Sequence, residues 1–284
     1  MTIEGANRLL ISSLSEIYDE REAASISSMV MERLTGMTKS LRVLNKTDVF
    51  TTGQEELLNG YLADLLKSRP VQYVLEEAWF GSIPFFVNEH VLIPRPETEE
   101  LVNWLLDDYN PAMENISVLD IGTGSGCIPV FLKKKRRGFN VLALDISEAA
   151  LEVAGKNSRT HDTPIDFFKC DVLDLQQREN IPRVDILISN PPYIPQRQKQ
   201  VLDKHVRDFE PGLALFVTDD DPILFYKVIG SIAKNKLNPG GTVYLEIHHD
   251  YAHQVMHWYE ENRFKLELKK DLSGNNRMIK AVVL

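Results

Sequence analysis

Apolar residues in the first 69 positions recur every three or four residues, the spacing that places them on one face of a helix. The two clearest series are Leu9, Leu10, Leu14 and Ile17, then Ile26, Val30 and Leu34. Gly36 follows as a helix stop, and a third series over residues 57–66 ends before Pro70. We therefore predict a small helical bundle over residues 1–69. Because it holds no catalytic constellation, we expect a substrate-recognition domain.

Residues 70–93 show a different pattern, with aromatic and β-branched residues on both sides of Gly81. Such residues favour strands and the glycine favours a turn, so we expect a β-hairpin linker between two domains. Pro96 then suits the first turn of a helix, with Glu97 and Glu99 near its positive N-terminal end. The third part comprises residues 94–284.

From residue 118 onward, short apolar runs alternate with helical patterns. The runs predict strands over residues 118–121, 140–144, 165–169, 184–189, 242–247, 263–269 and 277–283. Helices are expected over residues 222–236 and 251–261, and a turn over residues 238–241. Such alternation is typical of an α/β fold with a mostly parallel sheet, here with an antiparallel end.

Composition narrows the class of protein. The chain has 284 residues, of which 43% are hydrophobic and 26% charged, and its net charge is −9. Nucleic-acid binders usually carry a basic excess, so this acidity argues against one. Cys127 and Cys170 lack metal-ligand spacing and indicate buried thiols in a reducing compartment. With no basic leader and no run of about 18 apolar residues, we expect a cytoplasmic protein without a membrane span.

Three successive strands end in residues suited to an adenosine-containing ligand, at the sheet edge where ligands bind. After the first strand comes a glycine-rich turn, which allows close approach by a ligand at a helix N-terminus. Asp145 ends the second strand, where it can accept hydrogen bonds from ribose hydroxyls. Asp171 and Val172 follow the third, where an acid or a backbone group can meet an adenine edge. The residues of the turn are Gly122, Thr123, Gly124, Ser125 and Gly126.

The most specific chemistry follows the strand at residues 184–189, in the run Asn190-Pro191-Pro192-Tyr193. Two prolines cannot continue a sheet because neither has an N–H, so the chain must leave it in a stiff, extended form. The Asn190 side-chain oxygen and the Pro191 carbonyl can both accept hydrogen bonds from a planar NH2 group. Tyr193 offers an aromatic face for that group. In isolation, the same run also fits a rigid loop without a function.

With these motifs, the chain resembles the HemK/PrmC family of protein-glutamine N5-methyltransferases, which modify peptide chain release factors. The resemblance covers nearly the whole chain. It implies a class I S-adenosylmethionine-dependent methyltransferase fold, with a Rossmann-like seven-stranded sheet that has one antiparallel strand, over residues 94–284. The motifs are Arg69-Pro70-Val71-Gln72-Tyr73, Ile93-Pro94-Arg95-Pro96-Glu97-Thr98-Glu99, Asp120-Ile121-Gly122-Thr123-Gly124-Ser125-Gly126 and Asn190-Pro191-Pro192-Tyr193.

The resemblance also implies a cofactor and a partner. S-adenosylmethionine would be the methyl donor and S-adenosylhomocysteine the product. The glycine-rich turn would cradle the donor, Asp145 would hold its ribose, and Val172 would lie beside its adenine. The substrate would be the glutamine of the Gly-Gly-Gln loop in a release factor, and Asn190 would touch both donor and glutamine. We expect a monomer that does not bind nucleic acid directly. The residues expected at the glutamine are Asn190, Pro191, Pro192 and Tyr193, with Asn190, Pro191 and Tyr193 catalytic.

Three segments depart from the family's usual pattern. They are residues 75–77, residues 217–222, and Glu246-Ile247-His248, where Glu-Ile-Gly is more usual. All three lie outside the donor and amide motifs. They bear on loop shape and partner contacts, not on the reaction class.

Two other functions fit parts of the pattern. An enzyme that methylates an exocyclic amine of DNA or RNA needs the same NH2 site, and it could flip a base onto Tyr193. A nicotinamide-binding module would share a glycine-rich turn, but the turn's spacing and the run at residues 190–193 disfavour it.

Three further groups have open roles. His249, His253 and His257 are four apart and fit either a metal-binding helix face or a polar one; without a Glu-x-x-His pattern we expect no metal. Residues 133–137 fit a solvated helix end or a contact with an acidic partner. Glu97 and Glu99 fit either capping acids or a glutamine pocket.

Overall fold

The computed structural model describes all 284 residues and divides into two compact units. The first unit comprises Met1–Glu77 and Asp203–Phe209, and the second comprises Ala78–Leu202 and Glu210–Leu284. Each has its own hydrophobic core. None of the helices combines the length and apolar character that a membrane span requires.

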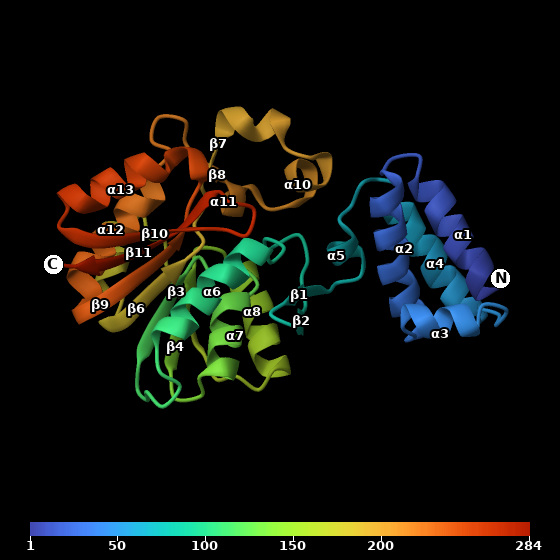
Figure 1. Cartoon of the computed structure of the whole chain (residues 1–284), viewed down its shortest axis with the longest axis horizontal. Coiled ribbons are helices and arrows are strands. Elements are labelled where there is room, and N and C mark those ends of the chain that lie inside the picture. Colours follow the sequence, from blue (N-terminus) through green and yellow to red (C-terminus); the bar gives the residue numbers. More distant parts are fainter. The chain divides into compact units, whose positions relative to one another are not determined.

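The first unit is a helical bundle in which α1, α2 and α4 lie side by side (Figure 1). Asp19 caps α2 by accepting hydrogen bonds from two backbone N–H groups, and Gly36 ends it with φ 65°. The predicted helices are confirmed, although Ile17 lies beyond α1 and is exposed. The short helix α3 was not predicted. The bounds are α1 Ile3–Leu14, α2 Glu20–Thr35, α3 Lys39–Leu44, α4 Thr52–Leu65, α5 Val71–Val74 and, from the second segment, α10 Lys204–Phe209.

The second unit is built on a seven-stranded sheet of order β10-β11-β9-β6-β3-β4-β5. Only β11 runs opposite to the other strands of the sheet, so the predicted mostly parallel sheet with an antiparallel end is confirmed. The bounds are β3 Ser117–Ile121, β4 Asn140–Asp145, β5 Asp166–Lys169, β6 Val184–Ser189, β9 Leu237–Glu246, β10 Phe264–Lys270 and β11 Asn276–Val283.

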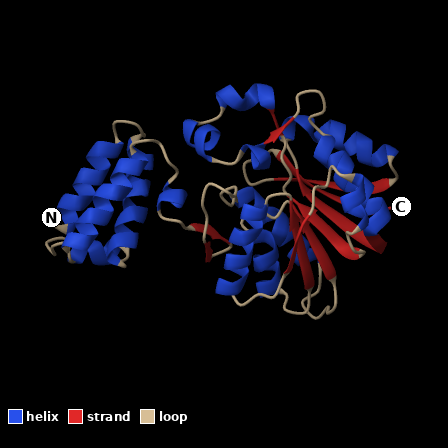
Figure 2. Ribbon diagram, turned by 180° about the vertical axis from the view of Figure 1, so that it is seen from behind, coloured by secondary structure: helices blue, strands red, loops and turns tan.

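Helices cover both faces of this sheet, as Figure 2 shows. The two faces follow from the alternation of side chains along each strand. Val118, Ile186 and Tyr244 pack in one core with α6 and α7, whereas the adjacent Leu119 and Leu187 pack in the other with α12 and α13. The helix bounds are α6 Pro96–Asp108, α7 Cys127–Lys135, α8 Glu148–Thr160, α9 Leu175–Glu179, α12 Leu224–Lys236 and α13 Ala252–Glu261.

Smaller elements complete the second unit. The predicted hairpin is present around Gly81, but the turn predicted at residues 238–241 is wrong, because these residues belong to β9. There the pairing with β6 shifts register, so the strand passes through an irregularity instead of reversing. The polar segment after β6 forms short elements that were not predicted. The bounds are β1 Ala78–Phe80, β2 Ile83–Phe85, β7 Ile194–Pro195, η1 Gln196–Val201, α11 Gly212–Leu215, β8 Phe216–Val217 and η2 His249–Tyr251.

Gly230 allows α12 to pack closely on α13, since a Cβ there would overlap the ring of Trp258. We expect Gly230→Ala to lower the free energy of unfolding by about 1–3 kcal/mol. Gly155→Ala is the matched control, because a Cβ in that part of α8 meets only the flexible end of Arg159. The control should raise the free energy of unfolding by up to about 1 kcal/mol. Urea unfolding followed by circular dichroism measures both, and a Gly230→Ala midpoint at or above wild type would contradict this packing.

Candidate active site

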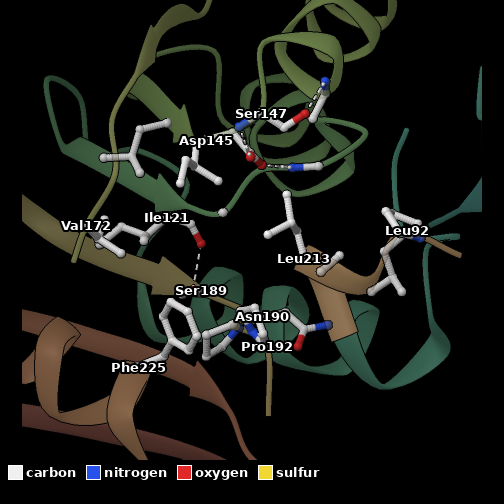
Figure 3. A pocket seen from close by; sticks show the side chains of 18 of the residues that line it. Leu92, Ile121, Asp145, Ser147, Val172, Ser189, Asn190, Pro192, Leu213 and Phe225 are labelled. Atoms are coloured by element: carbon white, nitrogen blue, oxygen red, sulfur yellow. Dashed lines mark hydrogen bonds between the residues drawn. The ribbon is translucent and has the colours of Figure 1, made fainter. Parts of the chain in front are cut away.

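A pocket of about 220 Å³ opens at the carboxyl ends of β3, β4 and β6, inside the second unit. In Figure 3, Asp145 and Ser147 lie on one side of it and Asn190 and Pro192 on the opposite side. Thr123, Ser125, Gly126 and Tyr193 are not part of its lining. The predicted residues that do line it are Gly122, Gly124, Asp145, Asp171, Val172, Asn190, Pro191 and Pro192.

The glycine-rich turn is held by β4. The backbone N–H groups of Gly122 and Thr123 both donate to the Leu144 carbonyl, at 2.9 and 3.0 Å. The N–H of Gly124 donates to Asp145 Oδ2 at 2.9 Å. Gly122 and Gly124 have φ of 76° and 54°, a region that other residues rarely adopt. The turn therefore offers the pocket a bare backbone surface, while these three N–H groups are used within the protein.

Asp145 is anchored by the backbone on both sides. Its Oδ1 accepts from the Ser147 N–H at 2.9 Å, while Oδ2 accepts from the turn. Burial raises the pKa of Asp145, and these backbone N–H groups oppose the rise. Each oxygen keeps a second lone pair for a ligand. Asp171 is similarly fixed, because its Oδ1 accepts from the Leu173 N–H at 2.8 Å.

Asp120 lies in β3, next to the glycine-rich turn, and is fully buried. Its carboxylate oxygens lack a well-formed hydrogen bond, although the Thr123 hydroxyl lies close enough to oppose the rise of its pKa. Burial raises the pKa of Asp120 to about 7, and the charge of Asp145 adds to the rise. Neither the Asp120 nor the Thr123 side chain lines the pocket, so a ligand bound there would not contact them directly.

The walls of the pocket are apolar and no lysine or arginine lines it. Ile121, Leu144, Val172, Phe225 and Ile229 contribute hydrophobic surface. The only basic side chain in the lining is His90, whereas Asp145 and Asp171 are acidic. Such a pocket suits a partly apolar ligand that is neutral or positive, and it is poorly suited to phosphate groups.

Asn190 and Pro191 present two free oxygens. Asn190 Nδ2 donates to Thr98 Oγ1 at 3.0 Å, and no group of the protein donates to Asn190 Oδ1. The Pro191 carbonyl accepts no hydrogen bond from the chain either. Both residues line the pocket. Two acceptors at this edge are thus available to a ligand that brings its own N–H groups.

Tyr193 points its hydroxyl away from the lining. It donates to Glu246 Oε1 at 3.1 Å, and its ring meets His248 edge-on with centroids 5.7 Å apart. Burial raises the pKa of Tyr193, and the negative charge of Glu246 adds to the rise. The role of the Tyr193 ring as a face for the substrate amide stays a prediction.

Several residues of the site carry no role in the sequence prediction. Glu246 is buried at the end of β9, and its Oε2 accepts from the Thr98 hydroxyl at 2.6 Å. Burial raises the pKa of Glu246, opposed by the hydroxyls of Thr98 and Tyr193 and the charge of Arg277. Asn157 donates to the Ser125 and Phe86 carbonyls, both at 2.9 Å, and so holds the glycine-rich turn. A polar residue within an apolar strand was the available signal for Glu246.

An ion pair and a hydrogen bond to Glu210 also shape the wall of the pocket. Arg95 forms an ion pair with the buried Glu210, whose second oxygen accepts from the Ile93 N–H at 3.2 Å. The residues directly after Glu210 include Pro211 and Leu213, which line the pocket. The segment before α6 therefore fixes the segment that forms this wall.

The prediction that His249, His253 and His257 share one helical face is wrong for His249. His249 belongs to η2, before α13 begins, so it does not share one helical face with His253 and His257. It lies instead beside His248 and Asp250, with their ligand atoms within 4.8 Å of one another. His248 Nδ1 already accepts from the Asp250 N–H at 3.2 Å, which occupies its lone pair. We assign no metal to this group.

Glu97 and Glu99 lie in the first turn of α6 and do not line the pocket. This placement favours a capping role, since acids stabilise the N-terminal end of a helix.

The sheet with its single antiparallel strand, the glycine-rich turn after β3 and the stiff run after β6 define the class I methyltransferase fold. A family model for the methyltransferase small domain matches residues 98–209. A methyltransferase from Pyrococcus furiosus has a similar structure, with a TM-score of 0.53 and 16% identity over 82% of this chain and 98% of that one. That likeness concerns the fold alone.

The family follows from two curated relatives. The chain is 37% identical to a release factor glutamine methyltransferase from Flavobacterium psychrophilum, over 99% of both chains. It is 36% identical to one from Bacteroides thetaiotaomicron, over 95% of this chain and 96% of the relative. The chain belongs to the release factor glutamine methyltransferase family, and the resemblance inferred from its motifs is confirmed.

The raised pKa of Asp120 predicts how stability depends on pH. Between pH 3.8 and about 7 the folded protein keeps a proton that the unfolded chain loses, so this group makes wild type less stable as pH rises. In Asp120→Asn this position no longer titrates, so the unfolding free energy of the variant does not fall with rising pH on account of this group. From about pH 5.5 to about pH 8, the variant should gain about 2 kcal/mol of unfolding free energy relative to wild type.

Urea unfolding of the ligand-free protein at both pH values measures this difference. The exposed Asp220→Asn is the control and should show no comparable gain. If the free energy of unfolding changes with pH in the same way for wild type and Asp120→Asn, the pKa of Asp120 is not raised and the prediction is wrong.

Proposed function

We propose that this protein transfers a methyl group from S-adenosylmethionine to the side-chain amide nitrogen (N5) of the glutamine in the Gly-Gly-Gln motif of peptide chain release factors. The family supports the reaction class. The single observation that carries the proposal is the pair of free acceptors, Asn190 Oδ1 and the Pro191 carbonyl, at the edge of the pocket. A primary amide brings the two N–H groups that such a pair can accept.

The pocket fits S-adenosylmethionine as donor, which supplies an electrophilic methyl group on a positively charged sulfur. The acidic lining, to which Asp145 and Asp171 contribute, favours a cationic ligand. Asp145 would accept from the ribose hydroxyls, and the residues near Asp171 and Val172 would hold the adenine. A nicotinamide dinucleotide is a weaker candidate, because the N–H groups of Gly122, Thr123 and Gly124, which could bind its pyrophosphate, already donate within the protein.

The amide nitrogen is a poor nucleophile because its lone pair is delocalised into the carbonyl. Asn190 Oδ1 and the Pro191 carbonyl would each hold one amide hydrogen and so fix the amide plane. Positive charge would grow on the nitrogen as its bond to the methyl carbon forms and the methyl–sulfur bond breaks, with S-adenosylhomocysteine as the leaving group. The two carbonyl dipoles would stabilise that charge. One N–H hydrogen then leaves as a proton, and the product is the neutral N-methyl amide. We name no general base.

The same acceptors discriminate against glutamate. A carboxylate would bring its own lone pairs against Asn190 Oδ1 and the Pro191 carbonyl. Leaving a buried acceptor unpaired costs about 1–3 kcal/mol, and an opposing charge costs more. The site therefore favours an amide over an acid of nearly the same shape. The helical unit would recognise the body of the release factor, and a monomer would suffice for both roles.

Incubation with methyl-labelled S-adenosylmethionine tests the function. We expect label in an intact release factor and a mass increase of one methyl on its Gly-Gly-Gln glutamine. A factor with that glutamine replaced by glutamate should take no label. Label found in DNA or RNA instead would support the exocyclic-amine alternative and overturn the proposal.

Asn190→Ala removes one of the two acceptors. We expect kcat to fall by at least about a hundredfold, because a dipole aimed at developing charge is lost. Donor affinity measured by calorimetry should stay within about threefold, since Asn190 is one of many residues that line the pocket. Asn235→Ala, on the exposed side of α12, is the matched control and should behave like wild type. Near-normal turnover by Asn190→Ala would exclude the role given to this residue.

A further inference from the structure

Thr98 makes two hydrogen bonds that have a fixed direction. It is a buried residue in the first turn of α6. Its oxygen lies 2.6 Å from Glu246 Oε2 and 3.0 Å from Asn190 Nδ2. A hydroxyl has one hydrogen to donate. If that hydrogen goes to Glu246, the Thr98 oxygen can only accept on its other side.

The carboxylate of Glu246 determines the direction of the Thr98 hydroxyl hydrogen. Its two oxygens receive hydroxyl groups from Thr98 and Tyr193, at 2.6 and 3.1 Å. An ionised carboxylate accepts and cannot donate, so both hydroxyl hydrogens must point towards it. Burial raises the pKa of Glu246, and the two hydroxyls and the charge of Arg277 oppose that rise; both hydroxyls donate to the carboxylate in the structure.

The direction of the Thr98 hydroxyl determines which end of the Asn190 side-chain amide faces Thr98. This amide has a donor end and an acceptor end of nearly equal size. Facing the Thr98 oxygen, only the donor end makes a hydrogen bond; the reversed amide would bring two acceptors together. Because Nδ2 faces Thr98, the oxygen is the end left for a ligand.

We infer that Thr98 and Glu246 are positioning residues, which act through the chain Glu246–Thr98–Asn190 to keep the Asn190 oxygen turned towards the substrate amide and so make the site select glutamine over glutamate. This inference rests on the proposed function. Neither Thr98 nor Glu246 lines the pocket, so they act through Asn190 and not on the substrate.

Thr98→Val tests the inference, because valine keeps the shape and removes both hydrogen bonds. We expect kcat for the release factor to fall at least about thirtyfold, since Asn190 then reverses freely. Donor affinity should stay within about threefold. Thr98→Ser restores the hydroxyl and should recover kcat to within about fivefold of wild type. The exposed Thr160→Val on α8 is the matched control and should leave kcat unchanged.

A selectivity readout separates positioning from a general loss of structure. A release factor carrying glutamate in the Gly-Gly-Gln position serves as a competitive inhibitor. A reversed Asn190 amide offers it an N–H, so Thr98→Val should narrow the preference for the glutamine factor over the glutamate factor by about tenfold. Thr98→Ser should keep the wild-type preference.

Wild-type kcat and preference in Thr98→Val would overturn the inference. If Thr98→Val does not bind the donor, Glu246→Gln tests the inference instead. Glutamine keeps the shape of Glu246, but it no longer forces the Thr98 hydroxyl to donate towards position 246. A drop in kcat of at least about tenfold with unchanged donor affinity supports positioning, and unchanged kcat overturns it. Failure of wild type to methylate any glutamine in the same assay would instead refute the proposed function.

Discussion

Carboxylates buried at the carboxyl ends of the parallel strands impose the main energetic constraint on this structure, because a buried charge without partners costs free energy. Asp120 and Glu246 are buried at such positions on β3 and β9, and Asp145 is partly buried at the end of β4. Asp145 is satisfied by backbone N–H groups of the glycine-rich turn and the start of α8. Glu246 is satisfied by hydroxyls from α6 and from the run after β6. The donors to Asp145 lie 2 and 21 positions away in the sequence, whereas those to Glu246 lie 53 and 148 positions away.

Satisfying each charge also builds one half of the pocket. Asp145 holds the glycine-rich turn against β4 and thereby shapes the side where the donor would bind. Glu246 joins α6 to the run after β6 and thereby orients Asn190 on the opposite side. Asp120 differs, since its oxygens lack a well-formed hydrogen bond. Burial raises its pKa to about 7, so protonation offsets the cost of burying this carboxyl group.

The sheet, its helices and the positions of the main motifs could be predicted from the sequence, because periodicity and glycine or proline signals are local. The turn predicted at residues 238–241 failed because glycine and proline also occur at irregularities within a strand. Short elements such as α3 and η1 bury too little to leave a periodic signal. The contacts of Thr98 could not be predicted from the sequence for a different reason. Its partners Asn190 and Glu246 lie 92 and 148 positions away, and no local pattern encodes such a pair.

The same network explains why the residue at position 190 is asparagine. The side chain there must donate to the Thr98 oxygen on one side and accept on the other. Aspartate would have the right length but no hydrogen for Thr98, and its charge would lie close to that of Glu246. Serine has one hydrogen and a shorter reach, so it could not span both contacts. An amide of this length meets both demands, and under the proposed function the carboxylate of Glu246 would decide which end of it faces the substrate.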